Sequence, residues 1–118
     1  MNILFLGDIV GFTGCEAVKK HLSNIKKKFR IDFVIVNGEN AANEGVGITK
    51  EITNNLFDYG VDVITTGNHV WDQKDIMKFI EKENRLLRPK NLFEPAPGSG
   101  FEIFSSKAYR CGPVRWNT

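Results

Sequence analysis

The sequence is poor in cysteine and histidine, contains no long hydrophobic run and has nearly balanced charge. Cys15 and Cys111 are too few and too far apart for a secreted disulfide scaffold or a C-x-x-C motif, which favours a reducing compartment. Met1 to Leu6 is apolar, but it lacks a basic flank and ends at once in Gly7-Asp8, so it resembles neither a signal peptide nor a membrane span. We therefore expect a cytoplasmic protein without a membrane partner.

Charge and length set two further limits. The 16 basic and 14 acidic residues leave a net charge of +2, which is too weak a bias to indicate nucleic acid, so we expect no stable nucleic-acid complex. A chain of 118 residues with 42% hydrophobic content suits one core and is too short for two ordinary domains. We expect a single domain over residues 1–118, with residues 106–118 as an atypical tail in which Arg110 to Thr118 shows no periodicity.

Short apolar runs alternate with segments of helical periodicity as far as Ile80. We predict three strands at residues 3–6, 33–36 and 61–66. A helix follows each strand: the first after a glycine-bearing loop at residues 11–14, the second capped by Thr49 and the third capped by Asp72. This alternation implies parallel strands joined by right-handed crossovers. The predicted fold class is therefore α/β, with a mostly parallel sheet and flanking helices.

The periodicity stops at Asn84, and all four prolines lie beyond that point. Because Arg88 to Gly100 is rich in proline and glycine and lacks an apolar face, we expect it to be irregular and mobile. Residues 101–104 are expected to form a fourth strand.

Each of the three predicted strands ends in a glycine followed by side chains that can bind a metal. These are Asp8 after the first strand, Glu39 and Asn40 after the second, and Asn68 and His69 after the third. Parallel strands place these side chains at one edge of the sheet. Carboxylate and amide oxygens suit hard cations, and an imidazole binds iron, zinc or manganese or donates a proton. In any one of these loops, the polar residues can be explained by ordinary roles in turns and helix caps. Three such loops at one edge of the sheet favour a shared binding site.

Two other phosphate-binding architectures fit less well. Gly7, Gly11 and Gly14 read G-x-x-x-G-x-x-G rather than the dinucleotide-binding G-x-G-x-x-G, and Asp8 would repel a pyrophosphate. A haloacid-dehalogenase-like phosphotransferase needs a second aspartate two residues after the first, where this chain has Val10. A carboxylate at this position favours a cation instead.

Three further features have ordinary structural explanations. His21 lies beside the apolar stripe of the first helix, where a boundary role is commoner than metal binding, so His69 is the candidate imidazole. Lys26 to Lys28 lie at a helix carboxyl end, where they complement the helix dipole. Trp71 suits a pocket wall and the core equally.

Four short sequence motifs are more specific together, in this order, than any one alone. They are residues 7–11 (Gly-Asp-Ile-Val-Gly), 37–42 (Asn-Gly-Glu-Asn-Ala-Ala), 67–72 (Gly-Asn-His-x-Trp-Asp) and 85–89 (Arg-Leu-Leu-Arg-Pro). Together they resemble the bacterial calcineurin-like metallophosphoesterases of the 2′,3′-cyclic-nucleotide phosphodiesterase group. The likeness runs from Met1 to about Phe104. It implies that this chain forms the amino-terminal half of an α/β/β/α sandwich.

The resemblance also implies a chemistry, namely hydrolysis of phosphodiesters such as 2′,3′-cyclic nucleotides at a site with two divalent or trivalent metal ions, iron or manganese. On it, Asp8, Glu39, Asn40 and Asn68 correspond to metal ligands, with Glu39 bridging the two ions. His69 corresponds to the catalytic residue that assists the leaving oxygen.

The family's downstream histidine-bearing blocks, His-Ala-Glu and Gly-Thr-His-Thr-His, have no counterpart among these residues, whose two histidines are His21 and His69. The remaining donors are fewer than a two-metal site requires. We therefore expect the isolated chain to be inactive and, with the inner face of its sheet uncovered, to self-associate. The alternative function is a non-catalytic remnant or interaction module, and the metal content of the purified chain separates the two.

Overall fold

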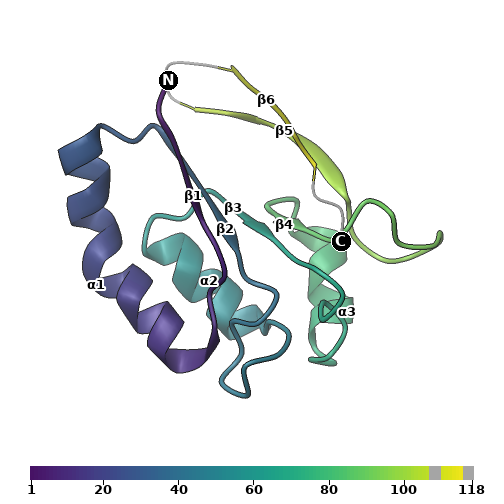
Figure 1. Cartoon of the computed structure of the whole chain (residues 1–118). Helices are drawn as coiled ribbons and strands as arrows, with labels where there is room; N and C mark the ends of the chain where they lie inside the picture. Colours follow the sequence, from purple (N-terminus) through teal and green to yellow (C-terminus); the bar gives the residue numbers. More distant parts are fainter. Residues whose placement is uncertain (107–109, 116–118) are drawn as a thin grey trace.

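The computed structural model describes residues 1–106 and the backbone of residues 110–115. Four strands form a parallel sheet in the order β1 (Ile3–Leu6), β2 (Phe33–Asn37), β3 (Val63–Thr65) and β4 (Leu86–Leu87). The predicted α/β fold with a parallel sheet is therefore confirmed, and the carboxyl ends of all four strands lie at the same edge (Figure 1).

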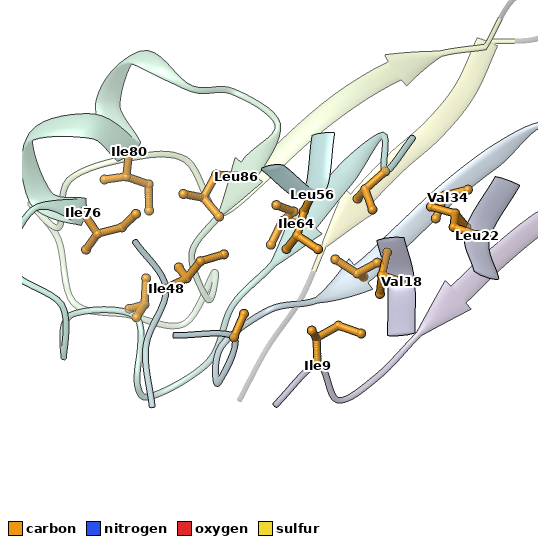
Figure 2. Close-up of a cluster of buried hydrophobic side chains, with 14 residues drawn as sticks. Ile9, Val18, Leu22, Val34, Ile48, Leu56, Ile64, Ile76, Ile80 and Leu86 are labelled. Carbon is orange, nitrogen blue, oxygen red and sulfur yellow. The ribbon is translucent and has the colours of Figure 1, made fainter. Parts of the chain in front are cut away.

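The helices cover one face of this sheet. They are α1 (Gly11–Phe29), α2 (Lys50–Asp58), α3 (Ile76–Phe79) and the 3₁₀ turn η1 (Ile80–Lys82). Their apolar side chains pack with those of the strands into one core, which Figure 2 shows. Its fully buried members include Leu22, Leu56, Ile64, Ile76 and Ile80. As predicted, Thr49 caps α2, because its Oγ1 accepts a hydrogen bond from the Ile52 N–H at 3.2 Å.

An antiparallel hairpin of β5 (Phe101–Ser105) and β6 (Arg110–Arg115) lies across the other face of the sheet (Figure 1). Phe104 packs against a second buried cluster there, made by Phe33, Val63 and Leu87, with the Phe33 and Phe104 ring centroids 5.9 Å apart. The expectation of an uncovered inner face is therefore wrong for this part of the sheet.

Several element boundaries differ from the sequence predictions. The predicted loop at residues 11–14 is the first turn of α1, because Gly11 adopts a left-handed φ of 58° and turns the chain directly into the helix. Asp72 does not cap the third helix, because that helix begins at Ile76 and Asp75 occupies its N-cap position; the Asp72 carboxylate contacts His69 instead. Strands β4 and β6 were not predicted. β4 has two residues, too few for a pattern, and β6 contains a proline and a glycine, so pairing with β5 determines it.

The segment from Arg88 to Gly100 contains no helix or strand, as predicted, but it is anchored. The Arg88 guanidinium is buried and donates to the Gly98 and Pro89 carbonyl oxygens and, at 2.8 Å, to Glu94 Oε1. Its backbone N–H donates to the Ser99 carbonyl. A single side chain thus organises the loop.

Within the described part of the chain, no helix has the length and apolar character needed to cross a membrane.

Candidate metal centre

The loops after β1 and β2 lie side by side at the carboxyl edge of the sheet. The Asn40 Nδ2 donates to Asp8 Oδ2 at 2.7 Å, and the Gly11 N–H donates to the Asn40 carbonyl oxygen at 2.9 Å. Val10 and Asn40 also form a parallel β-bridge. Two of the predicted site residues, Asp8 and Asn40, are therefore in direct contact.

Glu39 is positioned by Asn37, the last residue of β2. The Asn37 Oδ1 accepts a hydrogen bond from the Glu39 N–H at 3.0 Å, and its Nδ2 donates to Glu39 Oε1 at 3.4 Å. The carboxylate lies directly against Gly67, where a Cβ atom would overlap Glu39 Oε2. This close approach explains the glycine, and it brings the loop after β2 to the end of β3.

Two acceptor atoms in this cluster, Glu39 Oε2 and Asn40 Oδ1, are buried and have no hydrogen-bond partner among the described residues. A buried oxygen without a partner costs about 1 to 3 kcal/mol, and more where the group is charged. A cation can satisfy such an atom without requiring a donor. Each oxygen is thus suited to bind a metal ion, and Asn40 already contacts the Asp8 carboxylate.

Asn68 and His69 follow Gly67 on the third loop. The Asn68 side chain is exposed, and in the described part of the chain it makes no hydrogen bond to Asp8, Glu39 or Asn40. The half-buried His69 ring instead holds its Nδ1 2.7 Å from Asp72 Oδ2. This bond orients the imidazole and leaves Nε2 as the ring nitrogen that can act on a ligand.

Acidic and imidazole donors are sparse at this edge. Among residues 1–106 and 110–115, no group of three or more His, Cys, Asp or Glu side chains is close enough to hold a metal ion. His21 lines a surface pocket of about 480 Å³ between β1 and α1 together with Asp8, but it does not complete such a group. Any metal binding by the described residues therefore depends on amide as well as carboxylate oxygens.

Cys15 does not add a nucleophile. Burial, and then the neighbouring Glu16 carboxylate, raise the pKa of the Cys15 thiol. Its Sγ donates a weak hydrogen bond to the Ala41 carbonyl oxygen at 3.5 Å. The thiolate, which is the nucleophilic form, is therefore disfavoured.

Residues 4–113 match the family described as YmdB-like protein. The chain belongs to the YmdB-like family. It is 47% identical over 100 residues to the 2′,3′-cyclic-nucleotide 2′-phosphodiesterase of Bacillus subtilis, an alignment that covers 85% of this chain and 38% of that protein. The resemblance drawn from the four residue blocks is confirmed.

Two solved structures resemble this YmdB-like chain. A protein from Thermus thermophilus superposes with a TM-score of 0.85 and 38% identity, over 93% of this chain and 42% of that one. A phosphatase from Mycoplasma pneumoniae superposes with a TM-score of 0.80 and 36% identity, over 87% of this chain and 38% of that one. The chain is thus related to phosphodiesterases and phosphatases and spans about two fifths of the length of these relatives.

The sequence predictions did not identify the positioning role of three residues in the YmdB-like chain: Asn37, Gly67 and Asp72. Two of these roles could have been predicted from the spacing of residues that are close in sequence. An Asn two residues before Glu39 is the spacing of an Asx turn, and an Asp three residues after His69 can reach its ring. The close approach at Gly67 has no local signal, because it joins two loops that are far apart in sequence.

Proposed function

We propose that this chain carries part of the active site of a metal-dependent phosphodiesterase that hydrolyses phosphodiesters such as 2′,3′-cyclic nucleotides. One observation carries the proposal: two buried acceptor oxygens, Glu39 Oε2 and Asn40 Oδ1, lack hydrogen-bond partners in the described structure, and the Asn40 side chain contacts Asp8. Similarity to the Bacillus subtilis 2′,3′-cyclic-nucleotide 2′-phosphodiesterase supports the substrate class. The scarcity of cysteine supports a cytoplasmic location for this reaction.

The residues at the sheet edge fit metal binding. Asp8, Glu39 and Asn40 would hold the metal ions, with Glu39 bridging, and the exposed Asn68 would add a further oxygen donor by turning toward them. Iron or manganese suits this mixture of oxygen donors with a nearby imidazole. When bound, two metal ions would stabilise the negative charge of the phosphodiester and lower the pKa of a water molecule.

His69 is proposed to act on the leaving oxygen. With its Nδ1 bonded to Asp72 Oδ2 at 2.7 Å, the ring is fixed in orientation, and a proton on Nε2 is available to the departing alkoxide. The Asp72 carboxylate holds the ring in this orientation through Nδ1. Asp72 is therefore a positioning residue.

Metal binding by the 118-residue chain tests the proposal. We expect saturable binding of manganese by calorimetry and at least a tenfold loss of affinity in the Glu39→Gln variant, because the substitution removes the negative charge of the Glu39 carboxylate. The matched control is Glu51→Gln, which removes a carboxylate exposed in the first turn of α2. Equal affinities in the two variants would reject a role for Glu39 in metal binding.

A non-catalytic interaction module is the second candidate. The observation in its favour is that the described residues include no group of three His, Cys, Asp or Glu side chains arranged for a metal. A chain that purifies without metal and does not bind manganese in the calorimetric titration supports this candidate. Saturable metal binding at Glu39 contradicts it.

A further inference from the structure

A second functional surface is suggested by a pocket of about 520 Å³ formed by α3, η1 and the start of α2. Four exposed lysines line it, together with one acidic and one aromatic residue: Lys50, Lys74, Lys78, Lys82, Asp75 and Phe79. We call this set the lysine pocket. It concentrates four positive charges on a protein whose net charge is +2.

The lysine pocket has little internal charge compensation. Among the described residues, none of its four lysines forms an ion pair. One oxygen of its single carboxylate, Asp75 Oδ2, accepts a hydrogen bond from the Lys50 backbone N–H at 3.2 Å. The Lys50 ammonium group lies 5.5 Å from the centroid of the Phe79 ring. The charges are thus clustered without being neutralised.

A helix dipole does not explain this clustering. Lys78 and Lys82 lie on elements of four and three residues, which are too short for a substantial dipole. Lys26 to Lys28, in contrast, lie in the last turn of the 19-residue α1, where the dipole favours cations. Because neighbouring like charges destabilise a fold, the lysine pocket is better explained by an anionic ligand.

We propose that the lysine pocket binds the phosphates of a single-stranded oligoribonucleotide, so that the substrate is an RNA strand whose terminal cyclic phosphate reacts at the metal centre. This inference rests on the proposed function. Its geometric support is that Lys74, one of the four lysines, follows Asp72, the partner of His69, by two residues, so the Cα atoms of Asp72 and Lys74 lie at most roughly 7 Å apart.

The chemistry of the pocket favours a strand over a single phosphate. Four ammonium groups spread around an open pocket carry more charge than one phosphodiester can balance. Lysine binds phosphate as a point charge without the bidentate geometry of arginine, which suits contact with successive phosphates regardless of sequence. Positively charged grooves of this kind track the backbone of single strands. The net charge of the whole chain does not reveal this cluster, because it sums the clustered lysines with acidic residues elsewhere in the protein.

Fluorescence anisotropy with a labelled single-stranded oligoribonucleotide of about twelve nucleotides tests the proposal. The 118-residue chain is titrated in EDTA at several salt concentrations, so the readout needs neither metal nor turnover. If all four lysines contact phosphates, log K falls with log salt with a slope of about −2.8. We expect Lys74→Glu with Lys78→Glu to weaken binding at least tenfold, and the milder Lys78→Gln with Lys82→Gln to reduce the slope by about 1.4.

The matched control is Lys20→Glu with Lys27→Glu, which changes the net charge equally on the exposed surface of α1. It should change the affinity less than twofold. Equal losses in the two Glu double variants would overturn the proposal, as would tripolyphosphate binding as tightly as the oligonucleotide. Since Glu39→Gln tests metal binding separately, failure of the lysine pocket and failure of the metal centre are distinguishable.

Discussion

At the scale of single residues, the approach of Glu39 to Gly67 is the most sensitive feature of the site. A methyl group at Gly67 would occupy the position of Glu39 Oε2, so Gly67→Ala should displace the carboxylate and weaken manganese binding at least tenfold in calorimetry. Gly14→Ala is the control, because its added Cβ would meet the Ile9 side chain at 3.2 Å and no candidate metal ligand. Unchanged metal affinity in Gly67→Ala would show that Glu39 does not bind the metal.

The pair of His69 and Asp72 gives a second prediction at this scale. In a full-length relative with the same residue block, loss of the His69 imidazole should lower turnover by about 10² to 10⁴ and leave metal content nearly unchanged. Asp72→Asn should lower turnover less, by about 10- to 100-fold, because it removes only the orienting charge. Loss of metal from the His69→Ala variant would instead make His69 a ligand.

The orientation of the ring is measurable without activity. In the 118-residue chain, ¹⁵N spectra of the His69 imidazole should report a proton on Nδ1, held there by Asp72. Asp72→Asn should shift the neutral ring toward a mixture of tautomers. The same spectrum in both proteins would remove the positioning role.

At the scale of elements, Arg88 determines whether the segment up to Gly100 holds its conformation. Arg88→Lys loses several hydrogen bonds of the guanidinium, and we expect it to reduce the free energy of unfolding by about 2 to 3 kcal/mol in urea denaturation. Arg85→Lys is the control, since that exposed guanidinium pairs with Glu83 and lies over the Phe57 ring. Its cost should be about 1 kcal/mol or less. Equal costs would mean that Arg88 does not organise the loop.

At the scale of the whole molecule, we expect the isolated chain to release no product from 2′,3′-cyclic nucleotides or an activated aryl phosphodiester above a manganese-only blank. Catalysis needs both metal ions held with an open coordination position, and the described donors are too few. Following product release against added manganese checks this. Metal-saturable turnover that disappears in an Asp8→Ala variant would show that the donor set is sufficient.

The edge of the sheet gives another prediction at this scale. Ile3 and Phe5 of β1 are 50% and 46% exposed, and both lie on the face that the hairpin covers over β2, β3 and β4. We therefore expect sedimentation velocity to show self-association that rises with concentration. Ile3→Thr should shift the distribution toward monomer, whereas Met77→Thr, which changes an exposed apolar residue on α3, should not. A monomer at all concentrations would reject the prediction.

The sequence by itself determined the order of the first three strands and their helices, and the residues that follow each of these strands. Buried runs such as Phe33 to Val36 have a strong local pattern, and parallel strand direction follows from the alternation with helices. This was enough to place Asp8, Glu39 and Asn68 on loops at one edge of the sheet. The metal-ligand roles of these residues stay predictions.

Only the tertiary structure decided which of these side chains touch and which are free to bind. The unsatisfied oxygens of Glu39 and Asn40 arise because loops from different parts of the chain exclude water from one another, and no local pattern encodes that burial. Likewise, Asp72 could cap a helix or bind His69, and two residues at β4 could pair or not. Each of these alternatives is decided by the free energy of contacts between segments that are far apart in sequence. Those contacts form only in the folded structure, so no local sequence pattern predicts them.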